Sequence, residues 1–166
     1  MSYRFKGKLL KLKTVKKRLP NGRVIALELI EHPGAALIIP FLNKNEIILM
    51  RQFRPAIGQY LYELPAGTLE RGETPIACAR REIAEEIGFR AKIFQKLGFI
   101  YPVPGYSTEI IFIFKATKLM KTSHHFESDE IIKYFPVTKS KIRKFFKFGK
   151  IKDAKTISAL ALCGWI

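Results

Sequence analysis

One segment, residues 75–87, constrains the fold more than any other because it has the pattern of a helix with both ends marked. Thr74 is a preferred N-cap residue, Pro75 suits the first helical position, and Gly88 is the residue type that ends many helices. The apolar residues recur every three or four positions and form one face, made of Ile76, Ala79, Ile83 and Ile87. We therefore expect a helix that packs this face on a core.

The same helix carries three acidic residues on another side. Glu85 and Glu86 follow Glu82 by three and four positions, so the carboxylates crowd together. Like charges at this spacing cost about 0.2–0.5 kcal/mol per pair, and the C-terminal end of a helix is unfavourable for anions. A divalent cation removes the conflict, and oxygen ligands suit Mg²⁺ or Mn²⁺ better than Zn²⁺. The pattern indicates an exposed metal site, and Gly67 in the preceding loop would let a backbone carbonyl approach it.

The rest of the sequence combines short β-type runs with turns. Strand-like runs flank residues 19–22, and the further expected strands are 35–39, 46–50, 93–100, 109–118 and 131–136. Helices are expected at 139–147 and 153–162. Since strands and helices do not alternate regularly, the expected fold class is a mixed α+β or α/β sandwich. Residues 1–33 are expected to form a small N-terminal β-subdomain and residues 34–166 the main domain.

Composition limits the class of protein and its partners. The chain has 166 residues, 48% of them apolar, which suffices for one domain with a core. Its net charge of +16 indicates a polyanionic partner, such as nucleotide phosphates, nucleic acid or an anionic surface. Cys78 and Cys163 fit neither a disulfide framework nor a zinc site. No secretion signal or membrane-spanning stretch is visible, so we expect a cytoplasmic protein.

Around the acidic helix, the sequence resembles a complete Nudix box. Gly67 is followed after five residues by Glu73, and after seven more by the run Arg81-Glu82-Ile83-Ala84-Glu85-Glu86-Ile87-Gly88-Phe89. This resemblance implies an α/β/α Nudix-type sandwich with a mixed sheet, and a hydrolase that uses Mg²⁺, with Mn²⁺ as a substitute.

Outside the box, the chain is similar to ADP-ribose pyrophosphatases from about residue 5 to residue 162. The similar segments keep their order and spacing and are 31–35, 51–54, 62–67, 104–109 and 153–156. Pro104 stands fifteen residues after Phe89, which in this family marks ADP-ribose hydrolases. The resemblance implies hydrolysis of the diphosphate bond of ADP-ribose by metal-activated water, giving AMP and ribose 5-phosphate.

By match to these motifs, the resemblance assigns roles to individual residues. The metal ligands would be the backbone carbonyl of Ala66 and the carboxylates of Glu82, Glu85 and Glu86. Substrate-binding residues would be Arg51, Arg54, Glu63, Pro104 and Gly105. Glu73 and Arg81 would hold the loop and the helix together.

Besides Glu85 and Glu86, three glutamates are candidates for the catalytic base that activates water. Glu127 and Glu130 belong to a late loop of the type that supplies this base in ADP-ribose pyrophosphatases, and Glu109 follows Pro104 closely. The sequence leaves the choice among the three open.

The family resemblance also implies a homodimer in which the N-terminal β-subdomain crosses to the partner. Alternative functions remain: a pyrophosphatase for GDP-mannose or another ADP-sugar, an inactive ligand sensor, or an RNA-directed pyrophosphohydrolase or RNA-binding module. The RNA alternative is based on the basic stretch 139–155, which contains Phe145, Phe146 and Phe148. We expect these phenylalanines to form a core face and the lysines to be solvated, and we do not expect a nucleic-acid partner.

Overall fold

The computed structural model describes residues 3–7, 10–122 and 132–166. Its strands are β1 (Tyr3–Lys6), β2 (Lys11–Arg18), β3 (Val24–Glu31), β4 (Ala35–Pro40), β5 (Glu46–Arg54), β6 (Gln59–Glu63), β7 (Ala66–Thr68), β8 (Phe89–Ile100), β9 (Ile111–Lys121) and β10 (Ile132–Thr138). The helices are α1 (Pro75–Ile87), α2 (Lys139–Lys147) and α3 (Ala154–Leu162), and a 3₁₀ turn, η1 (Pro55–Ile57), joins β5 to β6.

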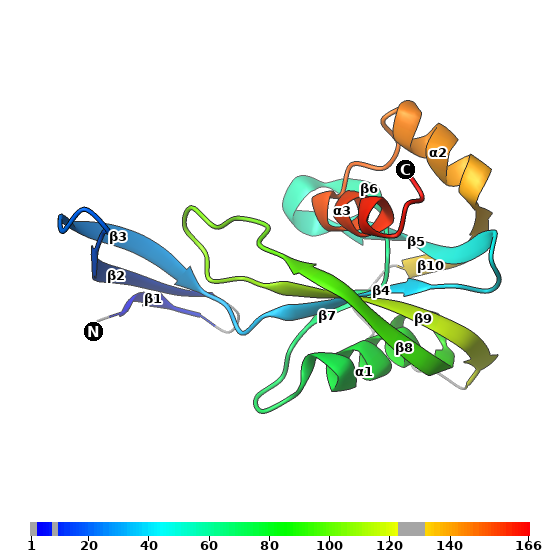
Figure 1. Ribbon diagram of the computed structural model, residues 1–166, viewed down its shortest axis with the longest axis horizontal. Helices are drawn as coiled ribbons and strands as arrows, with labels where there is room; N and C mark the ends of the chain where they lie inside the picture. The colour runs from blue at the N-terminus through cyan, green and yellow to red at the C-terminus, as the bar shows by residue number, and fades with distance from the viewer. Residues whose placement is uncertain (1–2, 8–9, 123–131) are drawn as a thin grey trace.

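The central sheet is mixed and has the order β7-β4-β9-β8, with β4 parallel to β9 and antiparallel to β7. A second sheet has the order β10-β5-β6, and a third the order β1-β2-β3. Helix α1 packs on one face of the central sheet and α3 on the other (Figure 1). The expected α+β sandwich with a mixed sheet is therefore confirmed.

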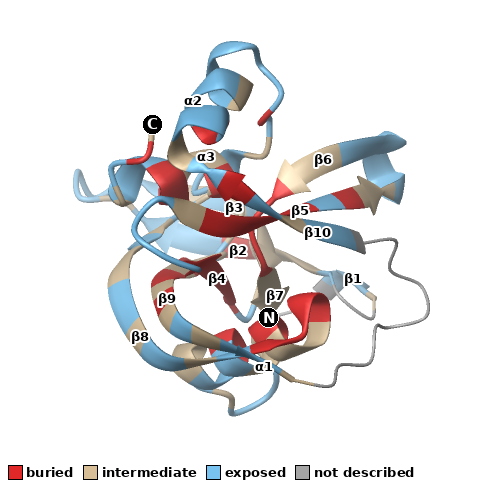
Figure 2. Ribbon diagram, turned by 90° about the vertical axis from the view of Figure 1, so that its right-hand side faces the viewer, coloured by how far each residue is buried: buried red, intermediate tan, exposed pale blue. Residues whose placement is uncertain are grey.

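Two hydrophobic cores lie on the two faces of the central sheet. Leu37 and Ile113 pack in the core that contains Trp165, whereas Ile38 and Ala116 pack in the core formed with α1. Consecutive strand residues point to opposite faces, so a strand covered on both sides is apolar throughout. Figure 2 shows the resulting buried residues in red on β4 and α1. The run of six buried residues in β4 follows from this two-sided burial.

Helix α1 begins and ends where the sequence predicts. The hydroxyl of Thr74 accepts a hydrogen bond from the N–H of Ala77 (3.3 Å). Gly88 adopts a left-handed conformation (φ 68°), and its N–H donates to the carbonyl of Ala84 (3.1 Å). The bounds predicted for α2 are also confirmed, and α3 begins one residue later than expected because Asp153 is its N-cap.

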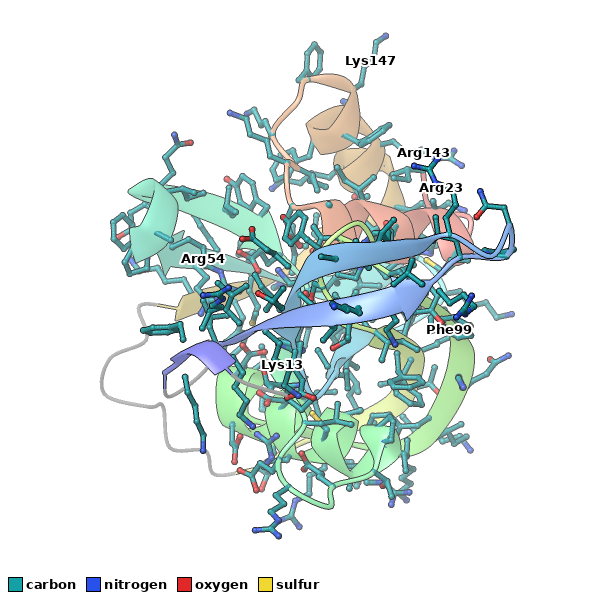
Figure 3. All side chains as sticks on the ribbon, turned by 90° about the vertical axis from the view of Figure 1, so that its left-hand side faces the viewer. Lys13, Arg23, Arg54, Phe99, Arg143 and Lys147 are labelled. Carbon is teal, nitrogen blue, oxygen red and sulfur yellow. The ribbon has the colours of Figure 1, made fainter. Side chains whose placement is uncertain are left out.

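The N-terminal sheet projects from the sandwich (Figure 1). It contains the predicted pair of strands around residues 19–22, together with β1 as a third strand. Its side chains include the basic Lys13 and Arg23 (Figure 3). The sheet contacts the β8–β9 connection, where the N–H of Ile30 donates to the carbonyl of Tyr106 (2.7 Å).

Two expectations about local structure were wrong. Residues 66–68 were expected to be a loop but form strand β7, because they pair with β4 in the register Leu37↔Ala66. The phenylalanines of α2 and its C-cap do not form a core face: Phe145 packs on the core, with its ring centre 5.0 Å from that of Tyr62, whereas Phe146 and Phe148 are exposed. Across the described residues, no helix has the length and apolar character of a membrane-spanning segment.

Candidate functional site

The acidic side of α1 borders a cleft of about 250 Å³. The cleft lies where α1 meets β7 and the end of β5, and it is lined by Arg54, Ala66, Gly67, Thr68, Arg81, Glu82, Glu85 and Glu86. Every residue predicted to be a metal ligand therefore lies on this cleft. Among the residues predicted to bind substrate, Arg54 joins them there.

The expectation of an exposed metal site on α1 was wrong for two of its carboxylates. Glu82 and Glu86 are buried, with 8% and 5% exposure. Strand β7 packs against them: the N–H of Ala66 donates to Oε2 of Glu86 (2.9 Å), and a Cβ on Gly67 would lie 1.6 Å from Oε1 of Glu82. Only glycine permits this approach of backbone to carboxylate.

Arg81 connects the acidic residues around the cleft. Its Nη1 donates to Oε1 of Glu82 (2.7 Å) and to Oε2 of Glu85 (3.0 Å). Its Nε and Nη2 donate to the two carboxylate oxygens of Glu73 (3.1 and 3.0 Å), and Nη2 also reaches the carbonyl of Thr68 (3.2 Å). The contacts expected of Glu73 and Arg81, which join the loop to the helix, are confirmed.

These contacts shift the protonation equilibria of Arg81 and Glu73 in opposite directions. The hydrogen bond from Arg81 lowers the pKa of Glu73 below its ordinary value of 4.5. The hydrogen bond to Glu73, together with the charges of Glu82 and Glu85, raises the pKa of Arg81 above its usual range. The ion pair of Arg81 with Glu73 is therefore charged at neutral pH.

The chemistry of the cleft fits a hard divalent cation. The carboxylate oxygens of Glu82, Glu85 and Glu86 are the ligand type that Mg²⁺ and Mn²⁺ prefer, and Gly67 brings a backbone segment against them. In the described part of the chain, no three acidic, histidine or cysteine side chains already converge as a metal cage. Arg81 pairs with two of the three carboxylates in this structure.

A second charged group, beside the cleft, is centred on Glu63, whose carboxylate is fully buried. Arg54 donates to both of its oxygens, from Nε (2.8 Å) and Nη2 (2.6 Å), and the ammonium group of Lys155 donates to it as well. Lys155 is paired in turn with Asp153 (2.9 Å). Glu63 therefore holds Arg54 in place and presents no oxygen atom to the cleft.

Burial and pairing act in opposite directions on Glu63. Burial raises the pKa of this carboxyl, but the hydrogen bond from Arg54 and the charge of Lys155 outweigh burial and hold the pKa below 4.5. The hydrogen bond to Glu63 correspondingly raises the pKa of Arg54. Glu63 is thus ionised inside the protein because two cations surround it.

The residues that begin α3 contact the site, although no role was predicted for them. Asp153 caps the helix by accepting from the N–H of Thr156 (3.0 Å), and the hydroxyl of Thr156 accepts from the N–H of Leu64 (3.0 Å). Lys155 contacts Glu63 across 92 sequence positions. The cap is visible in the sequence as an Asp before an apolar run, but the pairing with Glu63 has no local signal.

The structure does not bring the other predicted substrate-binding residues to the cleft. Arg51 is exposed, and its guanidinium carbon lies 4.0 Å from the ring centre of Tyr60. Pro104 and Gly105 are exposed on the turn between β8 and β9. These three residues do not line the cleft and remain predictions.

Among the further candidates for the catalytic base, Glu109 does not line the cleft. An oxygen of Glu109 lies 4.0 Å from Nε2 of His32, near the junction with the N-terminal sheet. Glu127 and Glu130 lie outside the described residues. The identity of the base therefore remains a prediction.

Comparisons with known proteins agree with this geometry. The NUDIX domain family matches residues 31–157. The chain is 34% identical over 158 residues to the ADP-ribose pyrophosphatase of Bacillus subtilis, covering 94% of this chain and 85% of the relative. It is 33% identical over 158 residues, with the same coverage, to the methanol dehydrogenase activator of Bacillus methanolicus. A solved structure described as an ADP compounds hydrolase has a TM-score of 0.82 at 22% identity, covering 98% of this chain and 88% of its own, which supports the fold.

Proposed function

The chain belongs to the NUDIX domain family, and on this premise we propose that it hydrolyses the diphosphate bond of ADP-ribose to give AMP and ribose 5-phosphate. The observation that carries the proposal is the cleft in which Glu82, Glu85 and Glu86 lie with Arg54. The name of the Bacillus subtilis relative supports ADP-ribose as the substrate, and the description of the structural neighbour supports an ADP compound.

A divalent cation would be held by the side chains and backbone of the cleft. Its ligands would be the carboxylates of Glu82, Glu85 and Glu86 and the carbonyl of Ala66, and the ion would be Mg²⁺, with Mn²⁺ as a substitute. When bound, the cation supplies positive charge that neutralises the diphosphate and makes water a better nucleophile.

Arg54 would bind the diphosphate directly. Glu63 occupies its Nε and one N–H of Nη2, so the remaining N–H groups of the guanidinium are available to substrate oxygens. The side chain is 37% exposed and lies beside the β5–β6 hairpin (Figure 3). Glu63 would act as a positioning residue, because it fixes the orientation of Arg54 without reaching the substrate.

The reaction transfers one phosphoryl group to water. Water adds to a phosphorus atom of the diphosphate, the bond from that atom to the bridging oxygen breaks, and the proton of water passes to a carboxylate. Glu85 and Glu86 would take part by holding the cation, and the proton acceptor would be Glu109, Glu127 or Glu130. Pro104 and Gly105, with Arg51, would contact the remainder of the substrate.

We further propose that residues 1–33 form a subdomain that joins two copies of the chain, while residues 34–166 form the catalytic domain. The N-terminal sheet exposes the apolar side chains of Phe5 and Val24, which a second copy would cover. The protein would act in the cytoplasm on a small-molecule substrate. Light scattering of the full chain tests the proposed dimer, and a monomer at micromolar concentration would contradict it.

The function is tested by measuring hydrolysis of ADP-ribose, ADP-glucose, GDP-mannose, diadenosine polyphosphates and 5′-triphosphorylated RNA with and without Mg²⁺. We expect ADP-ribose to exceed the other substrates at least about tenfold in kcat/KM, which is about 1.4 kcal/mol of transition-state preference. If GDP-mannose or ADP-glucose has the highest kcat/KM, the proposed enzyme class stands and ADP-ribose is the wrong substrate. Absence of turnover with any divalent metal would contradict the proposal.

A further inference from the structure

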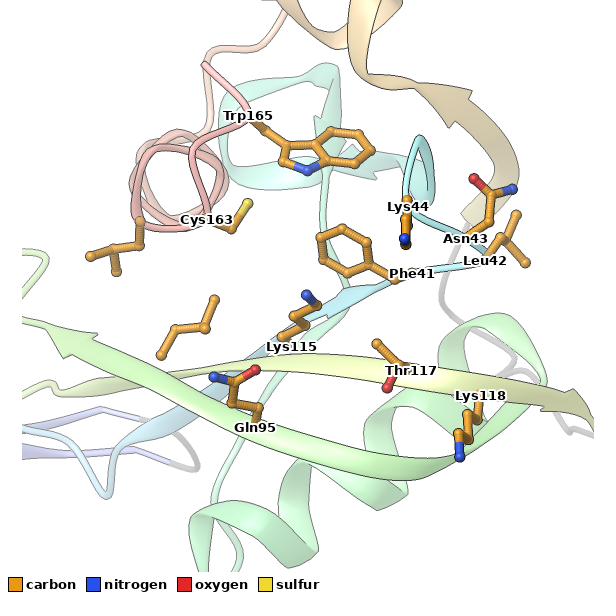
Figure 4. Close-up of a pocket in the computed structure, with 12 residues that line it drawn as sticks. Phe41, Leu42, Asn43, Lys44, Gln95, Lys115, Thr117, Lys118, Cys163 and Trp165 are labelled. Atoms are coloured by element: carbon orange, nitrogen blue, oxygen red, sulfur yellow. The ribbon is translucent and has the colours of Figure 1, made fainter.

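A cavity of about 630 Å³ lies on the face of the central sheet opposite α1. It is bounded by β8, β9, the β4–β5 turn and the end of α3 (Figure 4). On β9, Ile113 packs in the core of Trp165, whereas Ala116 packs in the core of α1. Since side chains alternate along a strand, Lys115 and Thr117 share the face of Ile113 and point away from the glutamates of the cleft.

Three lysines line this cavity: Lys44, Lys115 and Lys118 (Figure 4). In the part of the chain that the structure describes, none of the three ammonium groups forms an ion pair with a carboxylate. The arginines of the cleft, Arg54 and Arg81, are both paired with glutamates. Like charges in one cavity repel each other, and a bound anion would relieve that repulsion.

The backbone at Lys118 departs from regular strand geometry. Lys118 has a positive φ of 55°, which L residues other than glycine adopt at a cost in free energy. In a regular strand, residues three positions apart face opposite sides. The left-handed conformation breaks this alternation, so Lys118 borders the same cavity as Lys115, with its ammonium directed away from those of Lys44 and Lys115 (Figure 4). The pairing with β8 is interrupted at the same residue, between Thr117 and Leu119.

The remaining lining offers apolar surface and hydrogen-bonding groups. Leu97, Leu162 and the indole of Trp165 provide the apolar surface. Gln95, which pairs with Lys115 across the two strands, and Thr117 provide polar groups next to the lysines. A ligand that matches this lining has an anionic group joined to an apolar body.

We propose that this cavity binds a small organic phosphate, with its phosphate on Lys44 and Lys115 and its apolar body against Leu97 and Leu162. A phosphate monoester carries close to two negative charges at neutral pH and three strong acceptor oxygens, which suits several cations better than a singly charged carboxylate does. Lysine binds phosphate as a point charge, whereas planar pairing with a carboxylate favours arginine. The cavity volume falls within the range of about 300–1,000 Å³ that is typical of small-molecule sites.

The test uses the full chain and the position of its tryptophan. Trp165 is the only tryptophan of the sequence and borders the cavity, so its fluorescence reports on this site and not on the cleft. Phenyl phosphate, benzoate and inorganic phosphate are titrated separately, with calorimetry and fluorescence as readouts. We expect phenyl phosphate to bind with a saturable fluorescence change, and the other two to bind at least about tenfold more weakly.

Two variants locate the binding. Lys115→Gln removes one of the two proposed phosphate-binding charges, and Lys44→Gln removes the other. Each is expected to weaken phenyl phosphate binding at least about tenfold, while Lys133→Gln, at an exposed lysine of β10, leaves it unchanged. Neither cavity variant should change ADP-ribose hydrolysis.

Three results would overturn the proposal. The first is no heat of binding with phenyl phosphate up to about 10 mM. The second is equal binding of phenyl phosphate to the wild type and to both lysine variants, which would place the ligand elsewhere. The third is that benzoate binds as tightly as phenyl phosphate, which would mean that the cavity does not prefer a phosphate to a carboxylate.

Discussion

The two faces of the central sheet organise charge in different ways. Beside α1, Arg81 pairs with Glu82 and Arg54 pairs with Glu63, and both of these glutamates are buried. On the opposite side, the lysines of the cavity have no carboxylate partner among the described residues. Charges that hold one another in place contribute to the fold as well as to the chemistry, while unpaired cations are available to a ligand. Changes on the first face should therefore affect stability or activity strongly, and changes on the second should affect both much less.

The largest effect is expected for Glu86→Gln. The substitution removes a negative charge from the proposed metal site, so kcat for ADP-ribose should fall about 10³-fold, equivalent to about 4 kcal/mol. The fold should persist because the amide oxygen of glutamine can still accept the hydrogen bond from Ala66. Steady-state kinetics at saturating Mg²⁺ and the melting temperature check both parts. Glu46→Gln, at a carboxylate that contacts Asn43, is the control. Turnover within tenfold of the wild type would contradict the role of Glu86.

The next effect concerns stability. Glu63→Gln leaves Arg54 and Lys155 without their shared anion, so the free energy of unfolding should fall by about 3 kcal/mol. Urea unfolding measures this change. Glu70→Gln provides the control, because the side chain of Glu70 is 72% exposed and should change stability by less than about 0.5 kcal/mol. Equal losses for the two variants would show that burial of Glu63 has no special energetic role.

Gly67→Ala tests the close packing of β7 on α1. The new Cβ would lie 1.6 Å from Oε1 of Glu82, so the strand or the helix must move, with an expected loss of about 2 kcal/mol in unfolding free energy. Hydrolysis should decline as well, because Glu82 and its neighbours are displaced. Gly105→Ala serves as the control for stability alone, since open space surrounds that position. A fully stable Gly67→Ala protein would contradict the tight approach.

The sequence allowed the local parts of this arrangement to be predicted. Thr74 and Gly88 mark the ends of α1 because capping depends on residues within one turn of each other. The apolar run of β4 likewise reports its burial on both faces. The same local pattern placed Glu82, Glu85 and Glu86 together, and the structure brings all three to one cleft.

Features that depend on distant pairing could not be predicted. Strand β7 has three residues, too few for a periodic pattern, and exists because it pairs with β4. The burial of Glu82 and Glu86 follows from that pairing. The prediction that these two carboxylates are exposed was therefore wrong. The contact between Glu63 and Lys155 joins residues 92 positions apart, and nothing in either segment indicates the other. The positive φ of Lys118 could likewise not be predicted from the sequence.

Acid should reduce the contribution of Glu63 without any mutation. The folded-state pKa of Glu63 lies below the ordinary value of 4.5, so its stabilising effect is present above that pH and is lost as pH falls through the folded-state pKa. The difference in unfolding free energy between the wild type and Glu63→Gln should be constant above about pH 5.5 and shrink below pH 4.5. Urea unfolding across this range checks the sign, and a difference that grows in acid would contradict the assignment.

The smallest effect is expected on the other face, for Lys115→Gln. Its ammonium lies 4.7 Å from the centre of the Phe41 ring, and loss of this cation–π contact should cost less than about 1 kcal/mol in unfolding free energy. Removal of one positive charge from a cavity that is also lined by Lys44 offsets part of that cost. Hydrolysis of ADP-ribose should stay within about twofold of the wild type, because Lys115 lies on the face opposite the cleft. The unfolding free energy of Glu63→Gln is measured in parallel, so that the two variants can be compared directly. A loss in Lys115→Gln as large as that in Glu63→Gln would mean that the lysines of the cavity also hold the fold, and that charge is organised alike on both faces.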